Sequence, residues 1–155
     1  MWTRLLLVVS VLAGACSAER TALAPLGEGA PAASQIDWSG AVLLEVTLQD
    51  FAFAPSRLEL ARQHPYRLHL NNTGGGHNFD APAFFRTVVF RDDASSQRVR
   101  SAGGVIELAG HESLDVYVLP VRQGRYALRC SHLFHSSFGH DRRNRGELTE
   151  RATDL

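Results

Sequence analysis

The sequence has 155 residues, of which 45% are hydrophobic and 21% charged, as in ordinary soluble domains. Sixteen basic and sixteen acidic residues cancel, so the formal net charge is zero with neutral histidines. This balance gives no argument from composition for nucleic acid or an anionic membrane surface as a partner. The length suits one globular domain with a processing segment.

Composition divides the chain into four parts. We expect a signal peptide at 1–15, a flexible tether at 16–37, a folded domain at 38–150 and a short tail at 151–155. The tether is assigned because this stretch is rich in Ala, Pro and Gly, which favour a flexible chain.

The predicted signal peptide has a positive start at Arg4 and an apolar run that is short for a membrane span. The sequence LAGAC at its end resembles a bacterial lipobox, in which Cys16 would be lipid-modified and become the mature N-terminus. Ordinary cleavage after Ala15 or Ala18 is the alternative. In both cases we expect export to the periplasm or cell envelope, with membrane anchoring if Cys16 is acylated.

The folded domain consists of short segments that alternate apolar and polar residues at period two, which predicts strands. The expected strands are 41–48, 57–60, 66–72, 104–108, 113–119 and 126–130. Between them, 81–90 is expected to hold a turn or two of helix before an apolar run, and 91–103 to be a polar loop. Many short strands with regular turns predict an all-β fold, a Greek-key antiparallel β-sandwich.

The same alternation separates the histidines from the late cysteine. His69 falls on the face opposite its apolar neighbours, while His64 and His111 sit in turn sequences, so we expect none of the three to bind a metal. Cys130 points inward at the end of a strand. A solitary cysteine in an exported protein is either a small buried hydrophobe or a metal thiolate, and both interpretations stay open.

Two short motifs carry the potential chemistry. GGGHNF surrounds His77, and CSHLFHSSFGH spans 130–140. A copper ion that changes oxidation state favours a soft thiolate together with imidazoles. The end of a β-sandwich can hold such ligands rigidly, with one from an upstream loop and the others from a single loop after a late strand. Glycines before His77 would let the backbone approach a metal closely.

Together these motifs resemble those of cupredoxins, the small blue-copper β-sandwich proteins, over 42 to about 140. The resemblance implies His77 as the upstream imidazole and Cys130 as the thiolate. It implies His135 as the second imidazole, because Cys-x4-His is a spacing found in azurins.

The resemblance also extends to neighbours of the ligands. Gly76 and Asn78 match the azurin pattern, in which the glycine carbonyl approaches the metal and the asparagine connects the two ligand loops. By that analogy the Asn78 N–H would donate to the Cys130 sulfur, and its side chain would hold Ser131.

The chain departs from the family at the weak axial position, where Met is usual. His140 stands there instead, five residues after His135. An axial imidazole would favour oxidised copper, lower the potential and give a greenish or red centre. Alternatively, His140 faces solvent and the Gly76 carbonyl or water caps the site. His132 is expected not to bind, because only one residue separates it from Cys130.

The end of the chain departs as well. The stretch DRRNRGELTERATDL adds a basic segment, and its strand has Leu148 as its only apolar residue before the tail. We therefore expect this strand to form a poorly ordered edge.

The expected function is that of an exported mononuclear copper protein that transfers single electrons and is not an enzyme. A redox partner would dock at an apolar patch around His135 with Phe134 and Phe138. The alternatives are periplasmic copper storage, delivery or resistance, a small-molecule site of the red-copper kind, and zinc, which one Cys and three His would also satisfy. A single loop cysteine excludes a dinuclear copper centre, and the sequence has no His-x-His motif of a multicopper oxidase.

Overall fold

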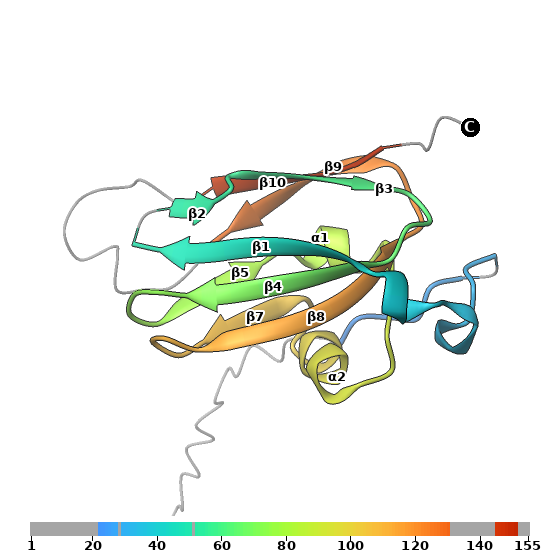
Figure 1. The fold of residues 1–155 in the computed structure, drawn as a ribbon, viewed down its shortest axis with the longest axis horizontal. Helices are drawn as coiled ribbons and strands as arrows, with labels where there is room; N and C mark the ends of the chain where they lie inside the picture. Colours follow the sequence, from blue (N-terminus) through green and yellow to red (C-terminus); the bar gives the residue numbers. More distant parts are fainter. Residues whose placement is uncertain (1–21, 28, 51, 131–144, 152–155) are drawn as a thin grey trace, which may run out of the picture.

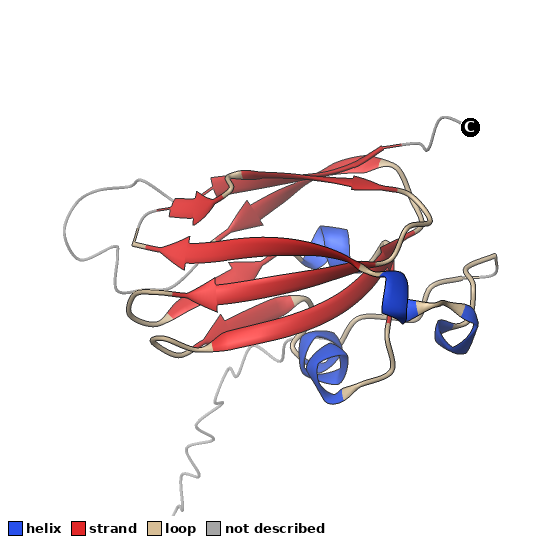
Figure 2. Cartoon of the chain, in the orientation of Figure 1, coloured by secondary structure: helices blue, strands red, loops and turns tan. Residues whose placement is uncertain are grey.

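A computed structural model describes residues 22–27, 29–50, 52–130 and 145–151 of the chain. Two five-stranded sheets stack face to face (Figures 1 and 2). The predicted all-β sandwich is confirmed. None of the helices within these residues has the length and apolar character needed to cross a membrane.

The first sheet has the strand order β2-β1-β4-β8-β6. Its strands are β1 (Val42–Gln49), β2 (Ala52–Ala54), β4 (Tyr66–Asn72), β6 (Val88–Phe90) and β8 (Ser113–Pro120). The second sheet has the order β3-β10-β9-β5-β7. Its strands are β3 (Arg57–Ala61), β5 (His77–Asp80), β7 (Val105–Leu108), β9 (Gly124–Arg129) and β10 (Arg145–Arg151).

Both sheets are mixed: each has one parallel pair beside the antiparallel pairs that the sequence predicted. β1 pairs in parallel with β4, and β3 pairs in parallel with β10. Parallel neighbours require a long crossover connection, and the chain between β1 and β4 supplies one because it carries β2 and β3. Alternation along one strand does not reveal the direction of its neighbour.

The core lies between the inward faces of the sheets, as the period-two pattern predicts. Leu68 and Leu70 of β4 are fully buried, as are Val116 and Val118 of β8. Phe79 of β5 lies among other aromatic rings, which adds favourable edge-to-face and tilted contacts to the apolar burial. This packing holds β5, which begins at His77, in a fixed position.

The short helical turn predicted in 81–90 is confirmed. It is α1 (Pro82–Phe85), and β6 follows it. Phe84 and Phe85 of this turn are buried in the core, and proline stands at the first position of the helix, where its missing N–H costs nothing.

The prediction of a polar loop at 91–103 is wrong, because this segment contains helix α2 (Ala94–Ser101). The helix buries a single apolar side chain, Val99, so it has no apolar periodicity to reveal it. The local sequence feature that marks the start of this helix is its N-cap residue, Asp93. Asp93 Oδ1 accepts a hydrogen bond from Ser96 N at 2.8 Å. Partial burial opposes ionisation of Asp93, but hydrogen bonds from Ser96 and Arg91 outweigh it and lower the pKa of this carboxyl.

The last strand is not an edge, which corrects the expectation from its polar sequence. β10 lies between β3 and β9 and pairs with both along its length. Leu148 is fully buried. Backbone hydrogen bonds on both sides do not depend on apolar side chains, so one inward leucine is enough to place the strand.

Part of the segment predicted as a tether lies against the domain. Leu23 N donates to Arg100 O at 3.0 Å, and Trp38 Nε1 donates to Ala33 O at 3.0 Å. Two short 3₁₀ helices, Ala33–Gln35 and Trp38–Gly40, lie in this region. Cys16 and the predicted signal peptide lie outside the described residues, so their assignments stay predictions.

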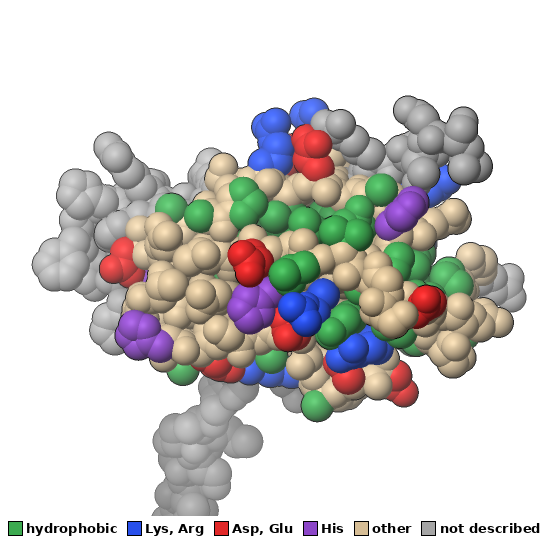
Figure 3. All heavy atoms as spheres, viewed as in Figure 1, with side chains coloured by type: hydrophobic (Ala, Val, Ile, Leu, Met, Phe, Trp, Pro, Cys, Tyr) green, Lys and Arg blue, Asp and Glu red, His purple; other side chains and the backbone are tan. Residues whose placement is uncertain are grey.

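The outer face of the first sheet mixes charged, histidine and apolar side chains without a patch of one sign (Figure 3). His69 faces outward there, as predicted, and its Nδ1 lies 2.8 Å from Asp115 Oδ1. His64 lies in the turn before β4, and His111 lies in the turn after β7 with a positive φ of 61°.

Candidate metal centre

Several strand ends meet at one end of the sandwich, on the left in Figure 1. β1 and β4 are parallel, so their last residues, Gln49 and Asn72, lie at the same end. The chain then turns back through residues 73–76 into β5, which begins at His77. β9 ends at this same end of the molecule, immediately before Cys130.

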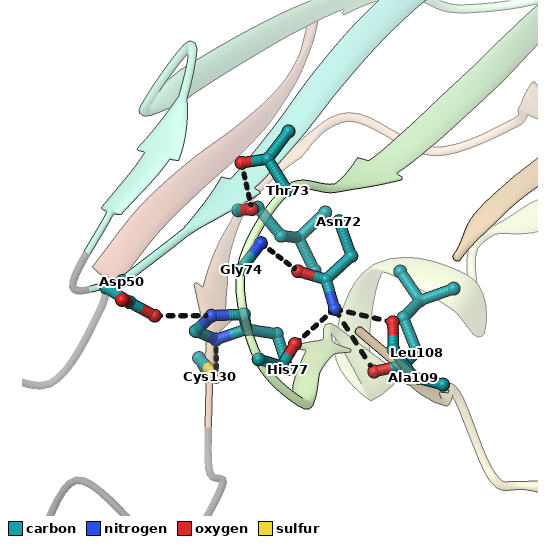
Figure 4. Close-up of polar contacts among 10 residues, drawn as sticks. Asp50, Asn72, Thr73, Gly74, His77, Leu108, Ala109 and Cys130 are labelled. Carbon is teal, nitrogen blue, oxygen red and sulfur yellow. Dashed lines mark hydrogen bonds and ion pairs between the residues drawn. The ribbon is translucent and has the colours of Figure 1, made fainter. Parts of the chain in front are cut away.

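His77 and Cys130 meet at this end although 53 positions separate them in the sequence. His77 Nδ1 lies 3.6 Å from Cys130 Sγ (Figure 4). The His77 side chain is 1% exposed, and the half-buried Cys130 packs against the core. The structure thus brings together two of the four predicted ligands, while their binding of a metal stays a prediction.

The separation of these two donor atoms is compatible with one shared metal ion. Bonds of about 2.3 Å to sulfur and about 2.0 Å to nitrogen would span 3.6 Å at an angle of about 115°. That angle lies between the tetrahedral and trigonal values. A soft sulfur beside an imidazole nitrogen is also a donor pair suited to copper or zinc. The pair therefore fits a metal in both distance and chemistry.

The other ring nitrogen of His77 faces a carboxylate. His77 Nε2 lies 3.1 Å from Oδ1 of Asp50, which immediately follows β1 and is 64% exposed. A hydrogen bond donated from Nε2 leaves the lone pair on Nδ1, which faces Cys130. Metal-binding histidines commonly donate their second ring N–H to a carboxylate in this way.

Asn72 organises the glycine loop between β4 and β5 (Figure 4). Its side chain is buried, and its Nδ2 lies 2.6 Å from Gly75 O, 2.7 Å from Ala109 O and 3.3 Å from Leu108 O. Its Oδ1 accepts from Gly74 N at 3.1 Å. These bonds join the loop to the turn after β7, and this fixes the loop's exit into His77.

Other groups approach the glycine loop closely, which favours glycine there. A Cβ atom at Gly74 would lie 3.0 Å from Asp50 Oδ1 and 3.1 Å from His77 Nε2. A Cβ atom at Gly110, in the facing turn, would lie 3.1 Å from Gly74 O. Gly76 is exposed in the bend just before His77, and the predicted approach of its carbonyl to a metal stays a prediction.

Asn78 is buried beside His77, and its Nδ2 lies 3.5 Å from Glu107 Oε1 on the neighbouring strand β7. The sequence-based prediction gave Asn78 the role of holding Ser131. Ser131 lies outside the described residues, so that role stays a prediction.

The remaining predicted site residues also lie outside the described part of the chain. They are His132, Phe134, His135, Phe138 and His140. Within residues 22–27, 29–50, 52–130 and 145–151, no cluster of three or more His, Cys, Asp and Glu side chains could hold a metal ion. A complete centre would therefore need donors beyond the His77–Cys130 pair.

Two residues of this site were missed by sequence reasoning. Asn72 had a readable signal, because it continues the inward face of β4 after Leu70, where a polar side chain must find hydrogen-bond partners. Asp50 had none, because its position beside His77 depends on the pairing of β1 with β4.

Comparisons with known proteins show which known fold the chain resembles. No family model and no curated protein matches the chain. Among solved structures, the McoA multicopper oxidase from the hyperthermophile Aquifex aeolicus is 15% identical with a TM-score of 0.51, over 76% of this chain and 31% of the oxidase. Auracyanin A, a "blue" copper protein from Chloroflexus aurantiacus, is 15% identical with a TM-score of 0.46, over 72% of this chain and 100% of that protein. Auracyanin B is 20% identical with a TM-score of 0.47, over 75% and 93%. The sheet order and the likeness to the oxidase domain together show that this chain has a cupredoxin-like β-sandwich fold.

Proposed function

We propose that this chain binds one copper ion and acts as an exported one-electron carrier. The ligands would be His77, Cys130 and His135, with His140 at the axial position. The observation that carries the proposal is the distance of 3.6 Å between His77 Nδ1 and Cys130 Sγ at the end of a cupredoxin-like sandwich. The similar oxidase domain belongs to a protein described as a multicopper oxidase, which makes copper a natural choice for this fold.

The donor pair supports copper on chemical grounds. A thiolate and an imidazole suit an ion that changes between a softer reduced state and a harder oxidised state. When bound, copper would supply the Cu(II)/Cu(I) couple, which takes one electron from a reduced partner and gives it to an oxidised one. Zinc accepts the same donors but has no redox chemistry, so zinc is the metal that an experiment must separate from copper.

The protein's own contribution is to hold the donors in place and keep water away from them. His77 begins β5, whose residues pair in register with β7. Asn78 and Phe79, which follow it, are buried. A ligand fixed by a paired strand and a packed core rearranges little when the charge at the site changes, which favours electron transfer over catalysis.

The route of the electron and the location of the protein are part of the proposal. His135, between Phe134 and Phe138 in an apolar patch, would be the exit toward a redox partner. Export to the periplasm or cell envelope rests on the leader sequence, and acylation of Cys16 would add a membrane anchor.

Loading the purified protein with copper tests the function. We expect one copper per chain by native mass spectrometry, an intense thiolate-to-copper absorption in the visible range, and a reversible one-electron wave in voltammetry. The matched variant Cys130→Ser is expected to lose the absorption. Stoichiometric zinc binding with no visible band from copper would contradict the proposal. A copper complex without a reversible wave would instead favour copper storage or delivery, and azide-induced spectral changes would indicate a small-molecule site.

A further inference from the structure

We propose that Asp50 is the positioning residue of the His77 ligand. Its carboxylate accepts the Nε2–H, fixes the ring tautomer and aims the Nδ1 lone pair at the shared metal position beside Cys130. This inference rests on the proposed copper site. The part of it that concerns the His77 tautomer applies to the metal-free protein and can be tested there.

The geometry of the ring supports this role. The His77 side chain is 1% exposed, so its orientation is set by its contacts rather than by solvent. One ring nitrogen is 3.1 Å from Asp50 Oδ1 and the other is 3.6 Å from Cys130 Sγ. A neutral imidazole carries a single N–H, so donation to the carboxylate determines which nitrogen is left to bind a metal.

The glycine loop also supports the positioning role of Asp50. Gly74 passes so close to the pair that a Cβ atom there would lie 3.0 Å from Asp50 Oδ1 and 3.1 Å from His77 Nε2. Asn72 holds this stretch through its bond from Gly74 N. The close passage of a glycine leaves room for the carboxylate and the ring to meet. The fold thus has a built contact at this point, because two segments far apart in the sequence, the residue after β1 and the loop into β5, converge on it.

A second histidine–aspartate pair in the same molecule provides an internal comparison. His69 Nδ1 and Asp115 Oδ1 are closer, at 2.8 Å, but His69 is 33% exposed on the outer face of the first sheet. Among the described residues the only cysteine is Cys130, and it contacts His77, not His69. Deleting Asp115 therefore removes the same kind of interaction on the outer face of the first sheet, together with the 3.8 Å ion pair between Asp115 Oδ1 and Arg67 Nε.

The experiment compares Asp50→Ala, Asp50→Asn and the control Asp115→Ala with the unaltered protein. Long-range ¹H–¹⁵N spectra of the metal-free proteins report the tautomer of each histidine. Copper affinity is measured by competition with a chelator of known affinity. Thermal unfolding checks that all variants fold.

We expect the Nε2–H tautomer at His77 in the unaltered protein and in Asp115→Ala, and a mixture of tautomers in Asp50→Ala. Loss of an outer hydrogen-bond partner typically lowers metal affinity about 10- to 100-fold, so we expect that loss in Asp50→Ala. Asp50→Asn keeps an acceptor oxygen without the charge and should restore part of both readouts.

Two results would overturn the inference. One is that Asp50→Ala matches Asp115→Ala in the His77 tautomer and in copper affinity. The other is a fall in affinity without any change of tautomer, since the carboxylate would then act through charge alone. If the unaltered protein binds no copper, the proposed function fails, while the tautomers of the metal-free variants still decide whether Asp50 orients His77.

Discussion

Replacing Asn72 by alanine should destabilise the whole candidate site, because this one side chain joins the glycine loop to the facing turn. Its two N–H hydrogens serve three backbone carbonyls, and its Oδ1 accepts from Gly74 N. The side chain therefore makes the equivalent of three full hydrogen bonds. At about 0.5–1.5 kcal/mol net for each, their loss should cost about 3 kcal/mol of unfolding free energy.

Urea denaturation of the metal-free protein measures this cost. The matched control is Asn71→Ala, which removes the neighbouring asparagine, whose Oδ1 accepts a single exposed bond from Ser113 Oγ at 3.0 Å. We expect the control to cost less than about 1 kcal/mol. Asn72→Asp conserves size and the acceptor for Gly74 N, but it places a carboxylate among three carbonyl oxygens. It should therefore cost at least as much as the alanine variant at neutral pH.

The reasoning is refuted if Asn72→Ala and Asn71→Ala have the same unfolding free energy within error. It is also refuted if Asn72→Asp is as stable as the unaltered protein, since the donors of the amide would then have no role.

Three further predictions concern the site and the fold. Gly74→Ala should lower copper affinity by about tenfold, because the added methyl group separates His77 from its carboxylate partner. The control Gly75→Ala, whose Cβ would have nothing within 4 Å, should leave the copper affinity measured by chelator competition unchanged. Equal affinities of the two variants would contradict the prediction. His140→Met should shift the copper spectrum toward blue and raise the potential, because thioether is a weaker axial donor; an unchanged spectrum removes His140 from the ligand set. Asp93→Ala should cost about 1 kcal/mol at pH 7, since Asp93 caps α2. Folding lowers the pKa of Asp93, so its contribution to stability is present above the ordinary pKa of about 3.9 and is lost as the pH falls through the folded pKa. The difference in unfolding free energy between the unaltered protein and Asp93→Ala, measured in urea, should therefore be smaller at pH 3 than at pH 7. A difference that does not change with pH would contradict the assignment.

The layers of the sandwich could be predicted because each strand's alternation is a local property. Leu68 and Leu70 face inward, and His69 faces outward, as the period-two pattern requires. The pairing of strands is not local. The parallel β1–β4 pair brings Asp50 to His77, and no pattern within 42–49 indicates it.

The convergence of His77 and Cys130 was readable for a different reason. Both residues lie at strand ends in motifs whose combination is specific, so a family resemblance could join them although they are 53 positions apart in the sequence. The helix at 94–101 was missed because its apolar content is a single buried valine, and strand β10 was misjudged because side-chain polarity does not report backbone pairing.

The most direct test of the central claim is X-ray absorption at the copper edge of the loaded protein, with Cys130→Ser and His77→Ala as variants. The account predicts one sulfur within about 2.3 Å of copper together with imidazole nitrogens, no sulfur in Cys130→Ser, and one fewer imidazole in His77→Ala. A copper environment without sulfur, or one that neither variant changes, would contradict it.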